Sequence, residues 1–189
     1  LIPVVIIFIR ENMNTRVRGR KDLDGLSVPF IGEIPLSIRG KKRVKSYEAH
    51  TIVVKEGSRD IMNEAFRVLR TNLEFMIGKA QSSNVIVVTS FNPGSGKSFL
   101  TMNIAMSLAI KNKKVLVIDG DLRHASASAY IHSPKIGLSN YLGGQIDKLS
   151  DIIVTNEQDP SFSFIPVGTI PPNPTELLFD DRLQKAIHT

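Results

Sequence analysis

A short apolar segment that runs into a glycine-rich turn and then into a helical pattern constrains the fold of this chain most strongly. Residues 85–89 (VIVVT) are all β-branched, as expected of a buried parallel strand. The turn reads PGSGKS over residues 93–98, and the periodic apolar residues after it predict a helix over residues 98–111. A strand, a tight glycine turn and a helix in this order form the context that a phosphate-binding loop requires.

Each residue type in this turn has an expected role. Backbone N–H groups can surround a phosphate, and the start of the helix adds a partial positive charge. Lys97 is predicted to reach the β- and γ-phosphates, and the Ser98 hydroxyl to bind Mg²⁺. Phe91 departs from the strict pattern, because a glycine belongs at its position, and the alternative interpretation is an ordinary strand–helix turn with a solvated lysine. The predicted nucleotide-binding residues are Gly94, Ser95, Gly96, Lys97, Ser98 and Phe99.

A second candidate site follows the next apolar run. Residues 115–118 (VLVI) predict a buried strand, and Asp119 and Asp121 come directly after it. Ligands bind at this end of the strands in doubly wound sheets. Two carboxylates beside a triphosphate are costly unless a cation lies between them, so they imply Mg²⁺. We expect Asp119 to act on the metal side, and Asp121 to orient or deprotonate an attacking hydroxyl. In the alternative, Asp119 caps a helix.

These assignments define two overlapping sets of residues. The candidate catalytic residues are Lys97, Asp119 and Asp121, and the candidate metal ligands are Ser98 and Asp119. The four histidines have no metal-ligand spacing, and His124, although near the carboxylates, is interpreted as a solvated loop residue. The absence of cysteine excludes disulfides, thiolate metal sites and cysteine catalysis.

Strand and helix patterns alternate along the rest of the chain. A helix is expected over residues 58–77 with Ser58 as its N-cap, a third strand over 161–167, and a helix start at Asn173 and Pro174. Such alternation predicts an α/β fold with a parallel β-sheet and helices on both faces. We expect a fold like that of the P-loop NTPases.

The net charge of +6 lies in one segment. Residues 10–45 contain ten basic and four acidic side chains, whereas the basic and acidic residues of 46–189 balance. The folded part therefore carries no basic stripe, and no nucleic acid partner is expected. Before this segment, residues 1–9 (LIPVVIIFI) contain no polar side chain.

The apolar start and the basic segment suggest three regions. Nine residues are too few to span a bilayer, which takes about 20. We interpret residues 1–9 as the end of a transmembrane helix and 10–45 as a basic juxtamembrane connector that favours an anionic leaflet. Residues 46–189 are then the P-loop domain. The alternative is a buried strand followed by a solvated basic loop.

Two motifs together resemble a known family. Residues 91–98 (FNPGSGKS), followed by 118–123 (IDGDLR), are similar to the bacterial tyrosine kinases (BY-kinases) of polysaccharide export. Those are P-loop proteins related to the cell-division and partition ATPases. In that family the second motif is a hydrophobic run followed by Asp-x-Asp-x-Arg, and the first glycine of the loop is commonly missing. Residues 91–93 lack the extra lysine of the partition ATPases, which favours the kinase branch.

The resemblance also implies an assembly motif. Residues 64–70 (EAFRVLR) resemble the E-x-x-R-x-x-R helix that mediates ring assembly between kinase domains in this family. The implied oligomerisation residues are Glu64, Arg67 and Arg70. Spacing by three on a helix places them along one slanted stripe. The alternative, which periodicity alone favours, is a solvated polar face with intrahelical ion pairs.

The function implied by the resemblance is that of an ATP-dependent protein-tyrosine autokinase in a membrane regulator of exopolysaccharide or capsule export. The implied cofactors are ATP or ADP and Mg²⁺, and the implied location is the cytoplasmic face of the bacterial inner membrane. The implied partners are further copies of the kinase domain in a ring, C-terminal tyrosines absent from this chain, and the polysaccharide export machinery. The alternatives are a partition-type or cell-division-type ATPase switch and a nucleotide-binding scaffold without phosphotransfer.

A third family motif, a hydrophobic strand ending in Asp, is not found in the sequence. Residues 151–155 end in Thr, and residues 161–167 are followed by Gly168. The three tyrosines are scattered, unlike the tyrosine-rich tail of the family. The resemblance therefore implies that the P-loop kinase domain, residues 46–189, is incomplete at its C-terminus. We expect this chain by itself to bind nucleotide with weak or no kinase turnover.

Overall fold

The computed structural model describes residues 3, 5, 8, 19–23, 25–35, 50–78, 84–157 and 159–188. The chain divides into two compact units, Leu1–Gly32 and Glu33–Thr189. In the first unit, η1 (Arg20–Leu23) is a 3₁₀ helix, and the Arg20 guanidinium lies over the Phe30 ring, 5.7 Å from its centroid.

The predicted membrane segment lies mostly outside the described residues. Of residues 1–9, the structure describes Pro3, Val5 and Phe8, and all three have helical backbone. No helix within the described ranges is both long and apolar enough to cross a bilayer. Most of the predicted basic connector, 10–18, 24 and 36–45, also falls outside these ranges. The assignment of these two regions therefore stays a prediction.

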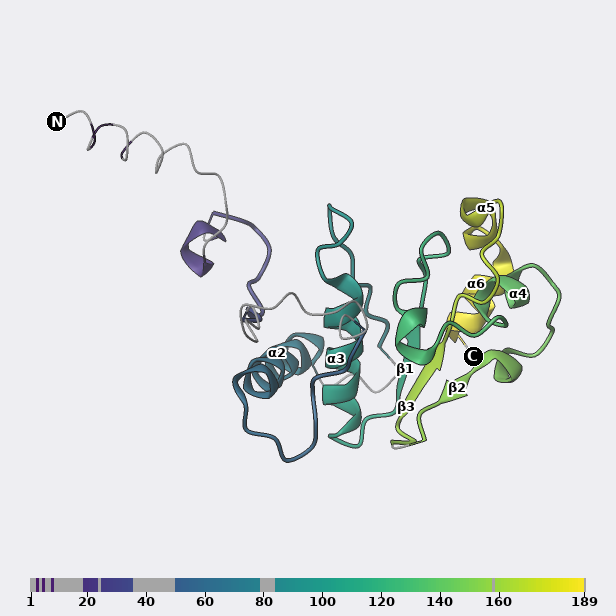
Figure 1. The fold of residues 1–189 in the computed structure, drawn as a ribbon, viewed down its shortest axis with the longest axis horizontal. Helices are drawn as coiled ribbons and strands as arrows, with labels where there is room; N and C mark the ends of the chain where they lie inside the picture. Colours follow the sequence, from purple (N-terminus) through teal and green to yellow (C-terminus); the bar gives the residue numbers. More distant parts are fainter. Residues whose placement is uncertain are drawn as a thin grey trace. The chain divides into compact units, whose positions relative to one another are not determined.

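The second unit contains the remaining helices and strands (Figure 1). In chain order they are α2 (Ile61–Ile77), α3 (Lys97–Ala109), β1 (Val115–Ile118), η3 (Ser128–Ile131), α4 (Leu138–Leu142), η4 (Leu149–Ile152), β2 (Val154–Thr155), β3 (Phe162–Ile165), α5 (Pro174–Leu178) and α6 (Asp181–His188). Helices precede, separate and follow the strands, so the predicted α/β class is confirmed, although the elements do not alternate strictly: α3 follows α2 directly, and β3 follows β2.

The three strands form one sheet in the order β1–β3–β2. Strands β1 and β3 are parallel, with Val115 opposite Phe162 and Ile118 opposite Ile165. The short strand β2 is antiparallel to β3. The sheet is therefore parallel where the α/β pattern predicted it, and mixed because of one short edge strand that the sequence analysis missed.

The predicted strand over residues 85–89 is wrong. These residues have no strand assignment, and Val85, Ile86 and Val87 are exposed. β-Branched residues favour strands only where their side chains pack and their backbone groups pair with a neighbour. No strand in the described part of the chain pairs with residues 85–89, so their composition alone does not produce a strand.

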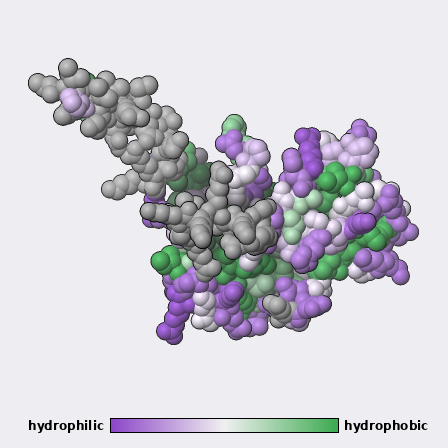
Figure 2. All heavy atoms as spheres, viewed as in Figure 1, coloured by the Kyte–Doolittle hydropathy of each residue, from purple (hydrophilic) through white to green (hydrophobic). Residues whose placement is uncertain are grey.

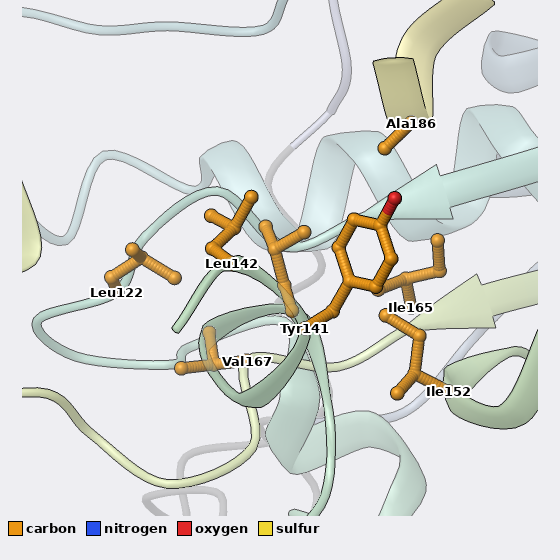
Figure 3. Close-up of a cluster of buried hydrophobic side chains, with 8 residues drawn as sticks. Leu122, Tyr141, Leu142, Ile152, Ile165, Val167 and Ala186 are labelled. Carbon is orange, nitrogen blue, oxygen red and sulfur yellow. The ribbon is translucent and has the colours of Figure 1, made fainter. Parts of the chain in front are cut away.

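Hydrophobic side chains gather on both faces of the sheet, because successive residues of a strand point to opposite faces. Phe164 packs on the side of α3, whereas its neighbour Ile165 packs on the side of α4 and α6. The cluster beside α3 contains Met102, Ala105, Ala109, Val117, Ala127, Phe162 and Phe164. The cluster on the other face contains Leu122, Leu138, Tyr141, Leu142, Ile152, Ile165, Val167 and Ala186, which converge from separate segments in Figure 3. The expected covering of both faces is thus confirmed.

A close backbone contact joins the start of α4 to the chain beyond β3. Leu138 N donates to Pro166 O at 2.7 Å, and Ser139 N donates to Val167 O at 2.9 Å. A Cβ on Gly137 would lie 2.2 Å from Pro166 O, a distance that real Cβ atoms do not reach. This junction therefore requires glycine at position 137.

Candidate functional site

The glycine-rich turn leads directly into α3. Gly94 and Gly96 have φ values of 73° and 92°, in the left-handed region that glycine adopts without strain. Gly96 occupies the N-cap position of α3, and no side chain caps the helix. Among the hydrogen bonds of the described residues, none uses a backbone N–H of residues 94–99. These N–H groups therefore remain available as donors to a phosphate, which fits the predicted nucleotide.

The turn is braced by its own side chains. The Ser95 hydroxyl donates to Asn92 O at 2.8 Å, and the Ser90 hydroxyl donates to the same oxygen at 2.9 Å. Phe91 is fully exposed, and Figure 2 shows an apolar tip on the loop that precedes α3. Since the Phe91 side chain points into solvent, its replacement of the usual glycine leaves the turn beside α3 open. Lys97 and Ser98, at the start of α3, are half-buried.

The carboxylate of Asp119 is buried directly after β1, with 4% of the residue exposed. Its Oδ2 accepts hydrogen bonds from both the backbone N–H and the hydroxyl of Ser128, each at 2.7 Å. Its Oδ1 accepts from Asp121 N at 3.2 Å. Asp119 thus holds Ser128, the first residue of η3, whereas the N-cap position of η3 belongs to Ala127. These contacts do not test its predicted role on the metal side.

Asp121 differs from Asp119 in exposure, since 38% of its side chain is accessible to solvent. Its Oδ1 accepts from His124 N at 3.1 Å and lies 3.3 Å from His124 Nδ1. An exposed carboxylate of this kind can reach a hydroxyl group and accept its proton. The histidine is mostly exposed, as predicted, but its contact with Asp121 was missed, although the spacing of three residues within a turn could have indicated it.

The two parts of the candidate site lie at one end of the sheet. Figure 1 shows the turn before α3 and the loop after β1 projecting on the same side, and α3 packs against β1. The described residues contain no cluster of three or more histidine, cysteine or carboxylate side chains that could hold a metal ion. Proteins commonly bind Mg²⁺ through one or two side chains together with phosphate oxygens and water, so the assignment of Ser98 and Asp119 as metal ligands stays a prediction.

The exposed face of α2 carries an ion pair. Arg67 Nε donates to Glu64 Oε2 at 2.9 Å, and a second hydrogen bond of 2.5 Å joins Nη2 to Oε1. The hydrogen bonds from Arg67 lower the pKa of Glu64, and those to Glu64 raise the pKa of Arg67. Both side chains are more than half exposed. This is the intrahelical pair of the alternative interpretation, on a face that a neighbouring molecule can reach.

Arg70 does not share that exposed face. It is 7% exposed, and its Nη1 donates to Ser107 O at 2.8 Å and to Ser107 Oγ at 3.1 Å, in the last turn of α3. Its Nε is buried without a partner in the described structure. A step of six residues turns a helix by roughly 120° from its starting face, so the slanted stripe runs from solvent into the contact with α3. The single exposed stripe thus holds for Glu64 and Arg67 and not for Arg70.

Residues 86–170 match the family model described as the CobQ/CobB/MinD/ParA nucleotide binding domain. The matched range includes the turn, α3 and the loop after β1, which carry the candidate site. Together with the α/β fold, this match makes the second unit a P-loop nucleotide-binding domain of that class.

Similar proteins of known function indicate which family of nucleotide-binding domains this chain resembles. The tyrosine-protein kinase wzc of Salmonella typhimurium is 30% identical over 204 residues, which cover 99% of this chain and 27% of that protein. The kinase domain of the Escherichia coli tyrosine kinase ETK matches with a TM-score of 0.72 and 31% identity, covering 89% of this chain and 66% of that one. The BceF tyrosine kinase domain matches with a TM-score of 0.66 and 34% identity, covering 85% and 65%.

This chain belongs to the bacterial tyrosine kinase family, and the resemblance noted from its two motifs is confirmed. It spans 27% of the length of the curated relative described above.

Proposed function

We propose that this chain is the ATP-binding catalytic domain of a protein-tyrosine autokinase that acts in exopolysaccharide or capsule export. The observation that carries the proposal is the open phosphate-binding turn beside a buried and an exposed carboxylate, Asp119 and Asp121. The similarity to tyrosine kinases over nearly the whole chain supports this reaction in particular.

In this proposal the nucleotide is ATP with Mg²⁺. The N–H groups of residues 94–99 bind the phosphates, and Lys97 neutralises charge on the transferring group. Ser98 and Asp119 hold the Mg²⁺, which supplies further neutralisation of charge when bound. Positioning and charge neutralisation supply most of the rate in phosphoryl transfer, so these residues matter by where they lie.

Asp121 is the proposed acceptor-side residue. Its carboxylate is more exposed than that of Asp119 and is available to a tyrosine hydroxyl. It orients the hydroxyl and takes its proton as the oxygen attacks. Asp119 is the less suitable base, because the residue is only 4% exposed and two donors from Ser128 already occupy its Oδ2.

The proposed partners are further copies of the domain, tyrosines of the same or a neighbouring chain, and the polysaccharide export machinery. We propose assembly through the α2 face that carries Glu64 and Arg67. Arg70 of the same helix contributes by holding α2 against α3 through its hydrogen bond to Ser107. The proposed location is the cytoplasmic face of the inner membrane, supported by the basic residues that follow the apolar residues 1–9. Nucleic acid is not a proposed partner.

The test is transfer of phosphate from radiolabelled ATP to tyrosine by the whole protein that carries this chain. We expect phosphotyrosine in the wild type and at least a hundredfold less in Asp121→Asn, because loss of an acid–base group costs about 10²–10⁴-fold in rate. The affinity for ADP should not change. The matched control is Asp147→Asn, an exposed carboxylate in the loop after α4.

Two other results would contradict the proposal. Release of inorganic phosphate without phosphotyrosine would identify an ATPase switch. Binding of ADP with neither product would identify a nucleotide-binding scaffold.

A further inference from the structure

Ser128 is buried where three segments of the chain meet. The residue is 1% exposed and begins η3. Its hydroxyl lies between the carboxylate of Asp119, which follows β1, and the backbone of Val167, which follows β3. The distances are 2.7 Å from Oγ to Asp119 Oδ2 and 2.9 Å from Val167 N to Oγ. One side chain thus connects the ends of both parallel strands at the candidate site.

The direction of each hydrogen bond at Ser128 is fixed by its partners. The Val167 N–H can only donate, so the Ser128 hydroxyl accepts there and its single proton goes to Asp119. The Ser128 N–H donates to the same Asp119 oxygen at 2.7 Å. Two short donors on Oδ2 hold the carboxylate against rotation about its last torsion angle, which is otherwise broad.

The other oxygen of Asp119 is held less tightly. Within the described residues its hydrogen bond comes from Asp121 N, at 3.2 Å. A carboxylate oxygen has two lone pairs, so Oδ1 retains acceptor capacity that Oδ2 has already used. The network around Ser128 therefore makes the two oxygens of Asp119 unequal.

We propose that Ser128 is a positioning residue for the metal side of the site, which keeps Oδ1 of Asp119 as the oxygen available to Mg²⁺ or to a water bound to it. This inference rests on the proposed function, in which Asp119 acts on the metal. Groups that hold a metal-binding side chain by hydrogen bonds commonly change metal affinity about 10- to 100-fold when removed. The competing explanation is that Asp119 and Ser128 only stabilise the start of η3.

The experiment separates nucleotide binding from the effect of the metal. ADP affinity is measured by calorimetry in EDTA and then at increasing Mg²⁺ concentrations, for the wild type and for Ser128→Ala. Alanine removes the hydroxyl and keeps the backbone donor to Asp119. We expect the wild type and Ser128→Ala to have equal ADP affinity in EDTA. The Mg²⁺ concentration that produces half of the change in ADP affinity should be approximately tenfold higher for Ser128→Ala than for the wild type.

Two comparisons exclude a purely structural effect. Ser139→Ala is the matched control, since Ser139 is also buried but its hydroxyl donates to Thr169 O. It should lower the melting temperature without changing the Mg²⁺ requirement. In an Asp119→Asn background, Ser128→Ala should cause no further change in that requirement. If Ser128→Ala does not fold, Ser128→Cys, a weaker donor of similar size, provides the same test.

The outcomes separate this inference from the proposed function. A Mg²⁺ requirement that is equal in the wild type and Ser128→Ala, with a lower melting temperature in the variant, would overturn the inference and leave Ser128 as a structural residue. Absence of ADP binding by the wild type, with and without Mg²⁺, would overturn the proposed function and the inference with it.

Discussion

Helices α2 and α3 pack against each other, but their N-termini are built in opposite ways. At the start of α2, the Asp60 carboxylate accepts from Met62 N at 2.9 Å and from Asn63 N at 3.0 Å. Hydrogen bonds from the Ser58 hydroxyl and from Asn63 lower the pKa of Asp60 from 3.8 to about 2. At the start of α3, Gly96 offers no side chain, and the nearby Ser95 hydroxyl donates to Asn92 O instead of capping the helix.

The difference separates a structural helix start from one that can bind. Every helix begins with N–H groups that lack an intrahelical partner. In α2 a charged side chain of the protein satisfies two of them, which stabilises the helix in the absence of any ligand. In α3 they stay available to an anion, and Lys97 adds a full positive charge beside them. A helix start without a side-chain cap thus indicates an anion-binding site where glycines and a lysine accompany it.

The largest effect is expected at Lys97. Lys97→Ala removes a charge-assisted contact with phosphate, worth about 1.5–3 kcal/mol, and should lower ADP affinity about ten- to a hundredfold. The melting temperature without nucleotide should hardly change, because the side chain is part of the open helix start. Calorimetry with ADP measures the first quantity, and Lys113→Ala, an exposed lysine beyond α3, is the control. Equal affinity in Lys97→Ala and the wild type would remove α3 from the phosphate site.

A smaller effect is expected at Gly96, where the backbone has a φ of 92°. Gly96→Ala has room for its Cβ, but places alanine in a strained conformation that costs about 1–3 kcal/mol. Both the melting temperature and ADP affinity should therefore fall. Gly120→Ala is the matched control, since it also meets no neighbour and lacks a positive φ. Equal melting temperatures of the two variants would show that the turn relaxes without strain.

The smallest effect is expected at the start of α2. Asp60→Asn should lower the melting temperature by a few degrees and leave ADP affinity unchanged. Because folding lowers the pKa of Asp60, its contribution to stability is complete above about pH 4 and is lost as the pH falls towards 2. The difference in melting temperature between the wild type and Asp60→Asn should accordingly shrink over that range. A difference that is constant from pH 6 to pH 2 would mean that the charge of Asp60 does not stabilise the cap.

Much of the fold follows from local patterns. The strand Val115–Ile118 has the predicted bounds, and Phe162–Ile165 lies within the predicted range 161–167. Helix α5 begins at Pro174 as expected, with Asn173 Nδ2 donating to Glu176 Oε2 at 3.1 Å. The N-cap of α2 lies two residues later than predicted, because Asp60 and not Ser58 caps the helix. These features depend on neighbouring residues, which a sequence pattern represents directly.

The features that sequence analysis missed depend on distant residues. Arg70 is buried because Ser107, 37 positions later, accepts its guanidinium, and nothing in the spacing of α2 indicates that partner. The connection from Asp119 through Ser128 to Val167 likewise joins segments that a local motif does not relate. The motifs identified the candidate site residues, but not which of them are buried and which are exposed.

The contact at Gly137 restricts which amino acids position 137 can hold as the sequence of this protein evolves. The oxygen that a Cβ would meet, Pro166 O, follows directly on β3 and already accepts a hydrogen bond from Leu138. Relief of the clash would require movement of β3 and of the hydrophobic side chains on both of its faces. All side chains other than glycine share that Cβ, so selection at this position acts on one atom and makes no distinction among the remaining amino acids. We expect position 137 to keep its glycine over evolutionary distances at which the surrounding surface has been entirely replaced.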